Sequence, residues 1–195
     1  MQNMKQVVAK DVGGEKVEYY IAWGNEKIVF IKAGAGGSAR GFQDKYIKMA
    51  ERINERKGST VVSASNLCVP QEGVDEEAIR WVISEKGFVD FEVYFVGTSD
   101  GAYKNLSLAK KFPQTVKTLG INASYITIEG LMDKLKDLPN VDKVLICGTK
   151  DIDSMVYVEP IQKAGIPKLK IQLVEGADHK FVGMLDEFIS LVDGL

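Results

Sequence analysis

Hydrophobic residues along this chain gather in short, nearly continuous runs of strand length, separated by stretches with helical spacing. The runs are rich in Val and Ile, as expected of strands buried on both faces of a sheet. A further short strand at 6–10 is expected to form an antiparallel hairpin with 17–23 through Gly13 and Gly14. The runs cover residues 17–23, 28–32, 60–64, 91–96, 116–122, 143–147 and 169–174.

Helical patterns fill the intervals between these strands. A helix over 75–86 is expected to begin with Asp75 as its N-cap and to end at Gly87. Further helices are expected directly after Ser99, over 131–138, over 155–163 and near the C-terminus. The clearest pattern places five apolar side chains on one helical face: Phe42, Tyr46, Met49, Ala50 and Ile53.

Strand and helix alternate throughout, which predicts a three-layer α/β sandwich. We expect a mostly parallel, twisted sheet of about seven or eight strands with helices on both faces. At 195 residues the chain fits one domain, 1–195, because no repeat, low-complexity tract or linker divides it.

Charge and composition exclude several classes of function. The formal net charge is −2 with both signs interspersed, so neither nucleic acid nor a membrane surface is expected as a partner. No apolar stretch has the length of a membrane span or the form of a secretory signal, which predicts a cytoplasmic protein. Cys68 and Cys147 form neither a disulfide framework nor a metal-ligand spacing.

A candidate nucleophile follows the apolar run at 91–96. The segment 97–101 reads G-T-S-D-G, a match to G-x-S-x-G, and a helical pattern comes directly after it. The pentapeptide alone is a weak signal, but its position between a strand and a helix would place Ser99 on a sharp turn. Gly97 and Gly101 suit such a turn, because a Cβ at either position would crowd the neighbouring backbone.

A serine hydroxyl needs a base nearby to become a nucleophile at neutral pH. His179 is the only histidine of the sequence, and it lies in G-A-D-H-K-F at 176–181, after the run at 169–174. Three aspartates are candidates for orienting that histidine. Asp151 follows the run at 143–147, Asp153 lies two residues later, and Asp178 directly precedes the histidine.

The glycine-rich segment 33–41, after the strand at 28–32, can be interpreted in two ways. As G-x-G-x-x-A it mimics a dinucleotide-binding fingerprint. That interpretation needs an acidic residue at the end of the following strand, where the sequence has A-S-N at 64–66. A nucleotide-binding protein is therefore disfavoured, and the second interpretation depends on a family resemblance.

Taken in order, the glycine loop, the G-x-S-x-G segment, the acid and the G-A-D-H-x-F segment resemble those of the α/β-hydrolases. The resemblance runs from about residue 17 to the C-terminus. It implies that Ser99, Asp151 and His179 form a catalytic triad. It also implies an oxyanion hole made by the backbone N–H groups of Ala35 and Asp100.

Two features depart from many members of that family. Ala33 occupies the position where the family usually has a histidine that helps to hold the glycine loop. Between the strand ending at 122 and the acid there is room for one short helix, so no cap domain is expected. The substrate pocket is then expected to be open and lined by residues from loops: Phe42, Asn66, Tyr125, Ile126 and Met155.

The resemblance implies a serine hydrolase that cleaves a small carboxylic ester, thioester or amide through an acyl-enzyme. A small acyl substrate is the expected partner, and neither a metal nor an organic cofactor is expected, since the triad supplies nucleophile and acid–base groups itself. The alternative is a non-catalytic protein that keeps the fold for binding. The sequence leaves the oligomeric state open.

Overall fold

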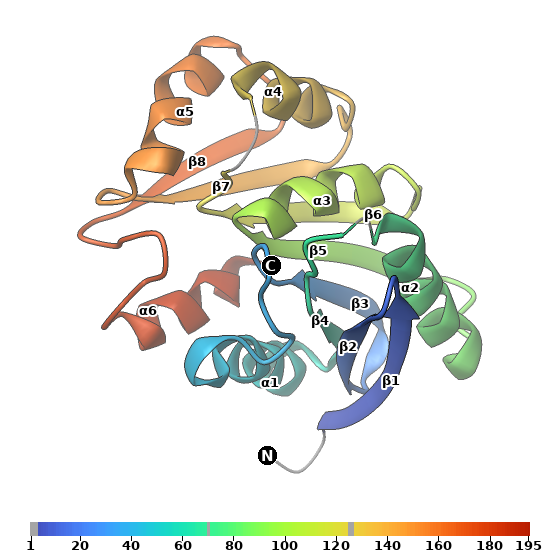
Figure 1. Cartoon of the computed structure of the whole chain (residues 1–195). Coiled ribbons are helices and arrows are strands. Elements are labelled where there is room, and N and C mark those ends of the chain that lie inside the picture. The colour runs from blue at the N-terminus through green and yellow to red at the C-terminus, as the bar shows by residue number, and fades with distance from the viewer. Residues whose placement is uncertain (1–3, 70, 125–126) are drawn as a thin grey trace.

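The computed structural model describes residues 4–69, 71–124 and 127–195, and within these ranges eight strands form one sheet (Figure 1). Each predicted apolar run is a strand, with ends that differ by at most three residues from those expected. The strands are β1 (Met4–Val12), β2 (Glu15–Ala22), β3 (Asn25–Lys32), β4 (Ser59–Ala64), β5 (Glu92–Thr98), β6 (Thr115–Ile121), β7 (Asp142–Gly148) and β8 (Leu169–Val174).

The order of the strands is β1-β2-β4-β3-β5-β6-β7-β8. The predicted hairpin is confirmed, since β1 and β2 are antiparallel, and β2 is also antiparallel to β4. From β4 to β8 all neighbouring strands are parallel. Because parallel strands end at the same edge, the segments that follow β3, β5, β6, β7 and β8 meet there.

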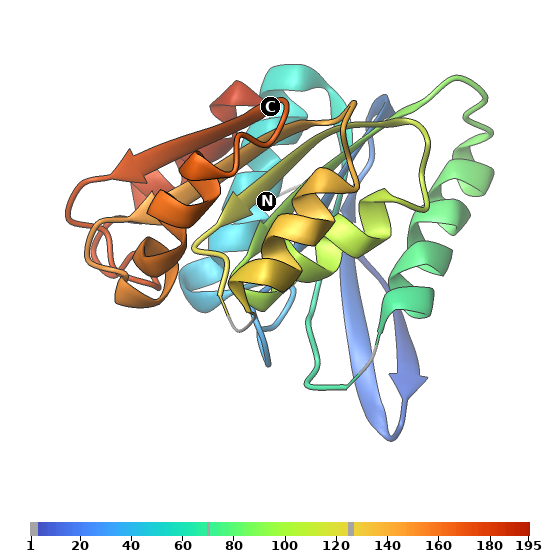
Figure 2. The same ribbon diagram turned by 90° about the horizontal axis from the view of Figure 1, so that it is seen from above.

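Helices cover both faces of the sheet and make the predicted three-layer sandwich. In Figures 1 and 2, α2, α3, α4 and α5 lie on one face, and α1 and α6 lie on the other. The helices are α1 (Lys45–Lys57), α2 (Glu72–Lys86), α3 (Asp100–Ala109), α4 (Ile128–Lys136), α5 (Ile152–Lys163) and α6 (Leu185–Ser190), with short 3-10 turns η1 (Phe42–Asp44) and η2 (Leu191–Gly194).

The alternation of side chains along β3 divides the core in two. Phe30 packs with the apolar side chains beneath α2, α3 and α4, while Val29 and Ile31 pack with those beneath α1 and α6. All three are buried. The continuous apolar run therefore reflects a strand that is covered on both faces.

Two local predictions are wrong. Phe42 does not share the buried face of α1, because the helix begins at Lys45 and Phe42 lies in η1 with 73% of its surface exposed. Asp75 does not cap α2, which begins three residues earlier at Glu72. Asp75 is instead buried inside the fold, where a positively charged side chain on β3 balances its negative charge.

That partner is Lys32, the last residue of β3, whose ammonium lies 2.7 Å from the Asp75 carboxylate. Both side chains are almost completely buried, and the Tyr19 hydroxyl donates to the same carboxylate at 3.0 Å. The ammonium also donates to the carbonyl oxygen of Ser65 and to the side-chain oxygen of Gln71. A buried charge with this many partners joins β2, β3, α2 and the segment after β4.

We expect Lys32→Met to lower the free energy of unfolding by about 3–5 kcal/mol, because it leaves the buried Asp75 carboxylate without its cation. Urea denaturation measures the loss. The control is Lys27→Met on the same strand, which removes a 3.5 Å ion pair with Glu92 that is half exposed on both sides and should change stability little. Equal losses for the two variants would contradict the assigned role of the buried pair.

Candidate functional site

Ser99 lies on a strained turn between β5 and α3. β5 ends at Thr98, α3 begins at Asp100, and Ser99 has φ 52° and ψ −128°. Its N–H donates to the carbonyl oxygen of Ile121 on β6 at 2.8 Å. A positive φ is uncommon outside glycine and persists only where surrounding contacts hold it. The turn therefore projects the Ser99 side chain beyond the edge where the parallel strands end.

Gly97 and Gly101 allow this turn for the reason that the sequence predicts. A Cβ at Gly101 would lie 2.2 Å from the carbonyl oxygen of Ala33, at the start of the glycine loop. A Cβ at Gly97 would lie 2.5 Å from the backbone nitrogen of Ala102 in α3. Both distances are shorter than real Cβ contacts, so only glycine lets α3 and the loop after β3 approach so closely.

His179 pairs with Asp151. The Nδ1 atom of His179 lies 2.9 Å from a carboxylate oxygen of Asp151, which is buried. Asp151 occupies the N-cap position of α5, yet its side chain makes no cap hydrogen bond. The competing Asp178 is occupied elsewhere, because its carboxylate accepts the N–H groups of Lys180 and Val182. With the proton on Nδ1, the Nε2 atom of His179 is the basic nitrogen.

Asn122 ties the histidine segment to the sheet. It follows β6 with a positive φ of 47° and is buried. Its side-chain amide donates to the carbonyl oxygens of Asp178 and His179 at 3.0 and 3.1 Å. Its side-chain oxygen accepts the N–H of Gly148 at 2.8 Å. One buried amide therefore fixes the segment that carries His179 against the strand that precedes Asp151.

Ser99 and His179 line the same cavity, with a volume of about 460 Å³. The hydroxyl of Ser99 lies 2.9 Å from that of Ser124, a buried residue just beyond β6. Ser124 is thus a second hydroxyl at the candidate nucleophile. The other residues that line the cavity come from the glycine loop, η1, α1 and the segment after β8: Gly34, Ala35, Gly37, Phe42, Lys45, Tyr46, Thr98, Lys180 and Val182.

Two backbone donors near Ser99 have no acceptor among the described residues: the N–H of Ala35, which lines the cavity, and the N–H of Asp100, the first residue of α3. The first N–H groups of a helix have no partner within it and carry partial positive charge. These donors can therefore interact with an oxygen that becomes negative beside Ser99.

No protein-family model matches the chain, and no curated protein is recognisably related to it in sequence. Solved structures are similar over almost its whole length. Est1E from Butyrivibrio proteoclasticus superposes with a TM-score of 0.72 at 14% identity, covering 99% of this chain and 97% of its own. A dienelactone hydrolase from Anabaena variabilis has a TM-score of 0.71 at 17% identity, with the same coverage.

An α/β serine hydrolase homologue from Coxiella burnetii has a TM-score of 0.71 at 16% identity, covering 100% of this chain and 97% of its own. The similarity in fold therefore extends over almost the whole of each chain. The chain has the α/β-hydrolase fold. As expected, it has no cap domain, because the described chain between β6 and β7 holds only α4 and the neighbours are of matching length.

Asn66 holds the glycine loop in place of the histidine that Ala33 replaces. The residue is completely buried, and its backbone N–H donates to the carbonyl oxygen of Gly37 at 2.8 Å. Its side-chain amide donates to the carbonyl oxygen of Ala33 and to the carboxylate of Asp100, both at 2.9 Å. Its side-chain oxygen accepts the ammonium of Lys104. Asn66 therefore connects both ends of the segment that contains Ala35 to Asp100, and Ala35 and Asp100 are the two residues near Ser99 whose N–H groups are free in the described part of the chain.

Three of the five predicted pocket residues lie in described segments, and their environments differ. Phe42 lines the cavity with Ser99, whereas Asn66 is buried beneath the glycine loop and Met155 lies in the first turn of α5, outside the residues that line that cavity. Tyr125 and Ile126 lie outside the described residues. The glycine loop leads into η1 and does not open a helix directly, which removes the remaining support for the dinucleotide interpretation.

The places of Asn122, Ser124 and Lys45 at this site were not predicted. Asn122 carried a detectable signal, since Asn at the end of a buried strand is one of the few residues that adopts positive φ readily. Ser124 and Lys45 had no such signal. Each lies near Ser99 only because the fold brings together segments that are distant in sequence.

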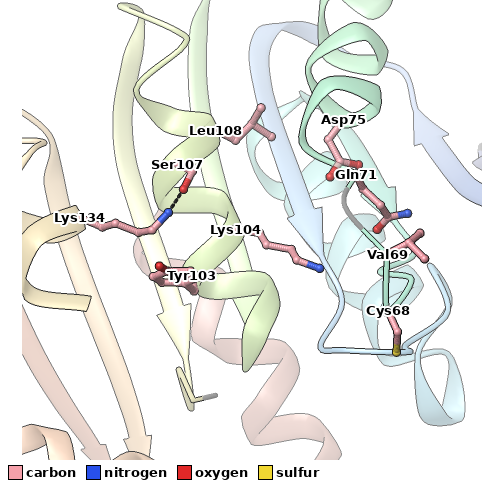
Figure 3. A pocket seen from close by; sticks show the side chains of 9 residues that line it. All are labelled: Cys68, Val69, Gln71, Asp75, Tyr103, Lys104, Ser107, Leu108 and Lys134. Carbon is pink, nitrogen blue, oxygen red and sulfur yellow. Dashed lines mark hydrogen bonds between the residues drawn. The ribbon is translucent and has the colours of Figure 1, made fainter. Parts of the chain in front are cut away.

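A second cavity of about 370 Å³ lies between α2, α3 and α4 (Figure 3). In Figure 3 the side chain of Lys134 points to Ser107, while Lys104 points away from it, toward the loop that carries Cys68 and Val69. The two cations therefore do not converge on one position. The only histidine of the sequence lines the first cavity, so the second has no serine–histidine pair.

The described side chains include no cluster of His, Cys, Asp or Glu that is arranged to bind a metal ion. None of the helices in the described ranges combines the length and hydrophobicity that a membrane span requires. Neither finding bears on the geometry of the first cavity.

We expect Asn66→Leu to loosen the glycine loop, because the carbonyl oxygen of Ala33 and the carboxylate of Asp100 each lose a donor. Hydrogen exchange should show faster exchange at residues 33–37 together with a stability loss of about 1–3 kcal/mol.

The matched control is Asn105→Leu, which removes a buried amide that donates to the carbonyl oxygen of Val96 within the α3–β5 contact. This control should lower stability without selectively exposing the glycine loop. Equal loosening of the loop in both variants would show that Asn66 has no special role there.

Proposed function

We propose that this protein is a serine hydrolase that cleaves a small carboxylic ester, with thioesters and amides as chemically related substrates. The observation that carries the proposal is the 2.9 Å contact between His179 and Asp151 beside a cavity that also contains Ser99 on its strained turn. The structural neighbours include an esterase, a dienelactone hydrolase and a thioesterase domain from the curacin biosynthetic pathway.

In the proposed reaction the Ser99 oxygen attacks the substrate carbonyl and its proton passes to Nε2 of His179. Asp151 holds the ring by its Nδ1 proton and stabilises the imidazolium that forms. The carbonyl oxygen becomes negative and accepts the N–H groups of Ala35 and Asp100. The tetrahedral intermediate collapses as His179 returns the proton to the leaving alcohol. Water then attacks the acyl-enzyme by the same steps and releases the acid.

The Ser99–Ser124 contact has a defined place in this proposal. In the resting arrangement the Ser99 hydroxyl is 2.9 Å from the Ser124 hydroxyl, so attack requires that it turn toward His179. A rotation about one side-chain bond is enough for such a change. The same contact is the one observation that favours the alternative, a non-catalytic binding protein in which Ser99 is held away from the base.

A fluorophosphonate probe separates the two functions. The hydrolase should be labelled at one site per chain, with labelling lost in Ser99→Ala and strongly reduced in His179→Ala, because only an activated serine reacts. Intact-protein mass spectrometry measures the stoichiometry. A folded protein that stays unlabelled would establish the non-catalytic alternative.

The assignment of Asp151 as the orienting acid is tested by replacing it and the nearby Asp153 in turn. We expect Asp151→Asn to lower the kcat for a nitrophenyl ester by a factor on the order of 10³–10⁴, because the amide favours the wrong histidine tautomer. Asp153→Asn, an exposed position in the first turn of α5, should leave kcat nearly unchanged. Comparable losses in both variants would reject Asp151 as the orienting acid.

A further inference from the structure

The cavity that contains Ser99 carries positive charge that the proposed reaction does not use. Lys45, the first residue of α1, and Lys180, directly after His179, both line it. Among the described residues no carboxylate lies within ion-pair distance of either ammonium, and neither ammonium has a hydrogen-bond acceptor. A partly buried cation without a partner costs free energy, so its presence beside a reaction site calls for a functional reason.

Lys45 is held in place by aromatic rings. Its ammonium lies 4.3 Å from the ring centre of Phe188 and 5.3 Å from that of Tyr46. Cation–π contacts of this kind orient the charge but leave its hydrogen-bond donors free. The side chain is therefore fixed at the wall of the cavity with donors available for a ligand.

The position of Lys45 is also unfavourable for the helix that carries it. The N-terminus of a helix carries partial positive charge, and acidic residues are preferred in its first turn. The first turn of α1 contains no acidic residue and begins with a lysine. Burial lowers the pKa of Lys45 to about 8, with Asp178 opposing this shift and Lys180 adding to it. A residue that breaks local rules in this way is typical of a functional position.

We infer that Lys45 and Lys180 recognise a carboxylate on the substrate, so that this site prefers esters with one negative charge. The inference rests on the proposed function and specifies its substrate class. Asp178 is the carboxylate that acts on Lys45 electrostatically, so two ammonium groups and one carboxylate leave a single positive charge unbalanced. That balance suits a carboxylate better than a doubly charged phosphate. The exposed apolar side chains of Phe42 and Val182 remain to contact the uncharged part of the substrate.

Two pairs of esters test the inference, each pair differing in charge and little in shape. For the acyl side, 4-nitrophenyl hemisuccinate is compared with 4-nitrophenyl 4-oxopentanoate, in which a methyl ketone replaces the carboxylate. For the alcohol side, 3-carboxyphenyl acetate is compared with 3-acetylphenyl acetate. We expect kcat/KM to favour the anionic member of at least one pair by about tenfold or more, through a lower KM.

Lys45→Gln should reduce that preference by about tenfold, and Lys45→Arg should keep most of it. The matched control is Lys48→Gln, the same change of charge at an exposed position one turn along α1, which should leave both kcat/KM values unchanged. Thermal unfolding should show that Lys45→Gln is at least as stable as the original protein. Lost stability in Lys45→Gln, or no preference for the anion in either pair, would overturn the inference.

The preference should also depend on pH in a way that identifies Lys45. As pH rises through about 8, its ammonium loses a proton and the preference for the anionic ester should fall, whereas Lys45→Arg should keep it. The other charged groups that face Lys45 are Asp178 and Lys180, and Asp44 and Lys48 lie on its own segment. Proton transfer by His179 is common to both esters, so its contribution cancels in the ratio.

A binding measurement separates this inference from the proposed reaction. Calorimetry compares monomethyl succinate, at neutral pH an anion, with dimethyl succinate on the Ser99→Ala protein. If no ester is hydrolysed but monomethyl succinate binds in a manner that depends on Lys45, the hydrolase proposal fails and the anion site stands. If esters are hydrolysed without regard to charge and monomethyl succinate does not bind, only the anion site is refuted.

Discussion

The close approach of α3 to the glycine loop is the constraint on which the whole site depends. The carbonyl oxygen of Ala33 occupies the space that a side chain at Gly101 would need, and this contact fixes where α3 begins. Ser99 adopts its strained backbone with its N–H donating to the carbonyl oxygen of Ile121 on the neighbouring strand. The strain is stored locally and compensated by the packing of two parallel strands and one helix.

Buried amides then connect the segments that this constraint brings together. Asn66 links the glycine loop to the first residue of α3, and Asn122 links the histidine segment to β7. Each amide uses both donors and its oxygen, so neither can turn without leaving buried groups unsatisfied. Lys32, which is paired with Asp75, also holds Ser65, the residue next to Asn66, because its ammonium donates to the Ser65 carbonyl oxygen. Ala33 does not leave the glycine loop unsupported, since Asn66 provides the hydrogen bonds.

At the cavity that contains Ser99, in contrast to these amides, several polar groups have no partner among the described residues. The N–H groups of Ala35 and Asp100 have no acceptor among the described residues, and none of the described carboxylates lies within ion-pair distance of the Lys45 ammonium, on which Asp178 acts from farther away. Buried ammonium groups elsewhere in the described chain have polar partners: Lys32 pairs with Asp75, and Lys143 donates to the carbonyl oxygens of Leu138 and Val141. The contrast between these partnered ammonium groups and the free donors at one edge of the sheet is what a binding site for a polarised or anionic substrate requires.

The sequence by itself determined the strands, their mostly parallel arrangement and the residues at their ends, because hydrophobic periodicity and glycine positions are local properties. It therefore indicated the need for Gly97 and Gly101, while the resemblance to the α/β-hydrolases pointed to Ser99, Asp151 and His179. It misplaced Phe42 and Asp75, since the start of α1 and the burial of Asp75 are decided by contacts with other elements. Only the tertiary structure decided which aspartate meets His179, that Ser124 touches Ser99, and that Lys45 stands unpaired at the cavity. These are relations between segments far apart in the chain, and no local pattern encodes the distance between them.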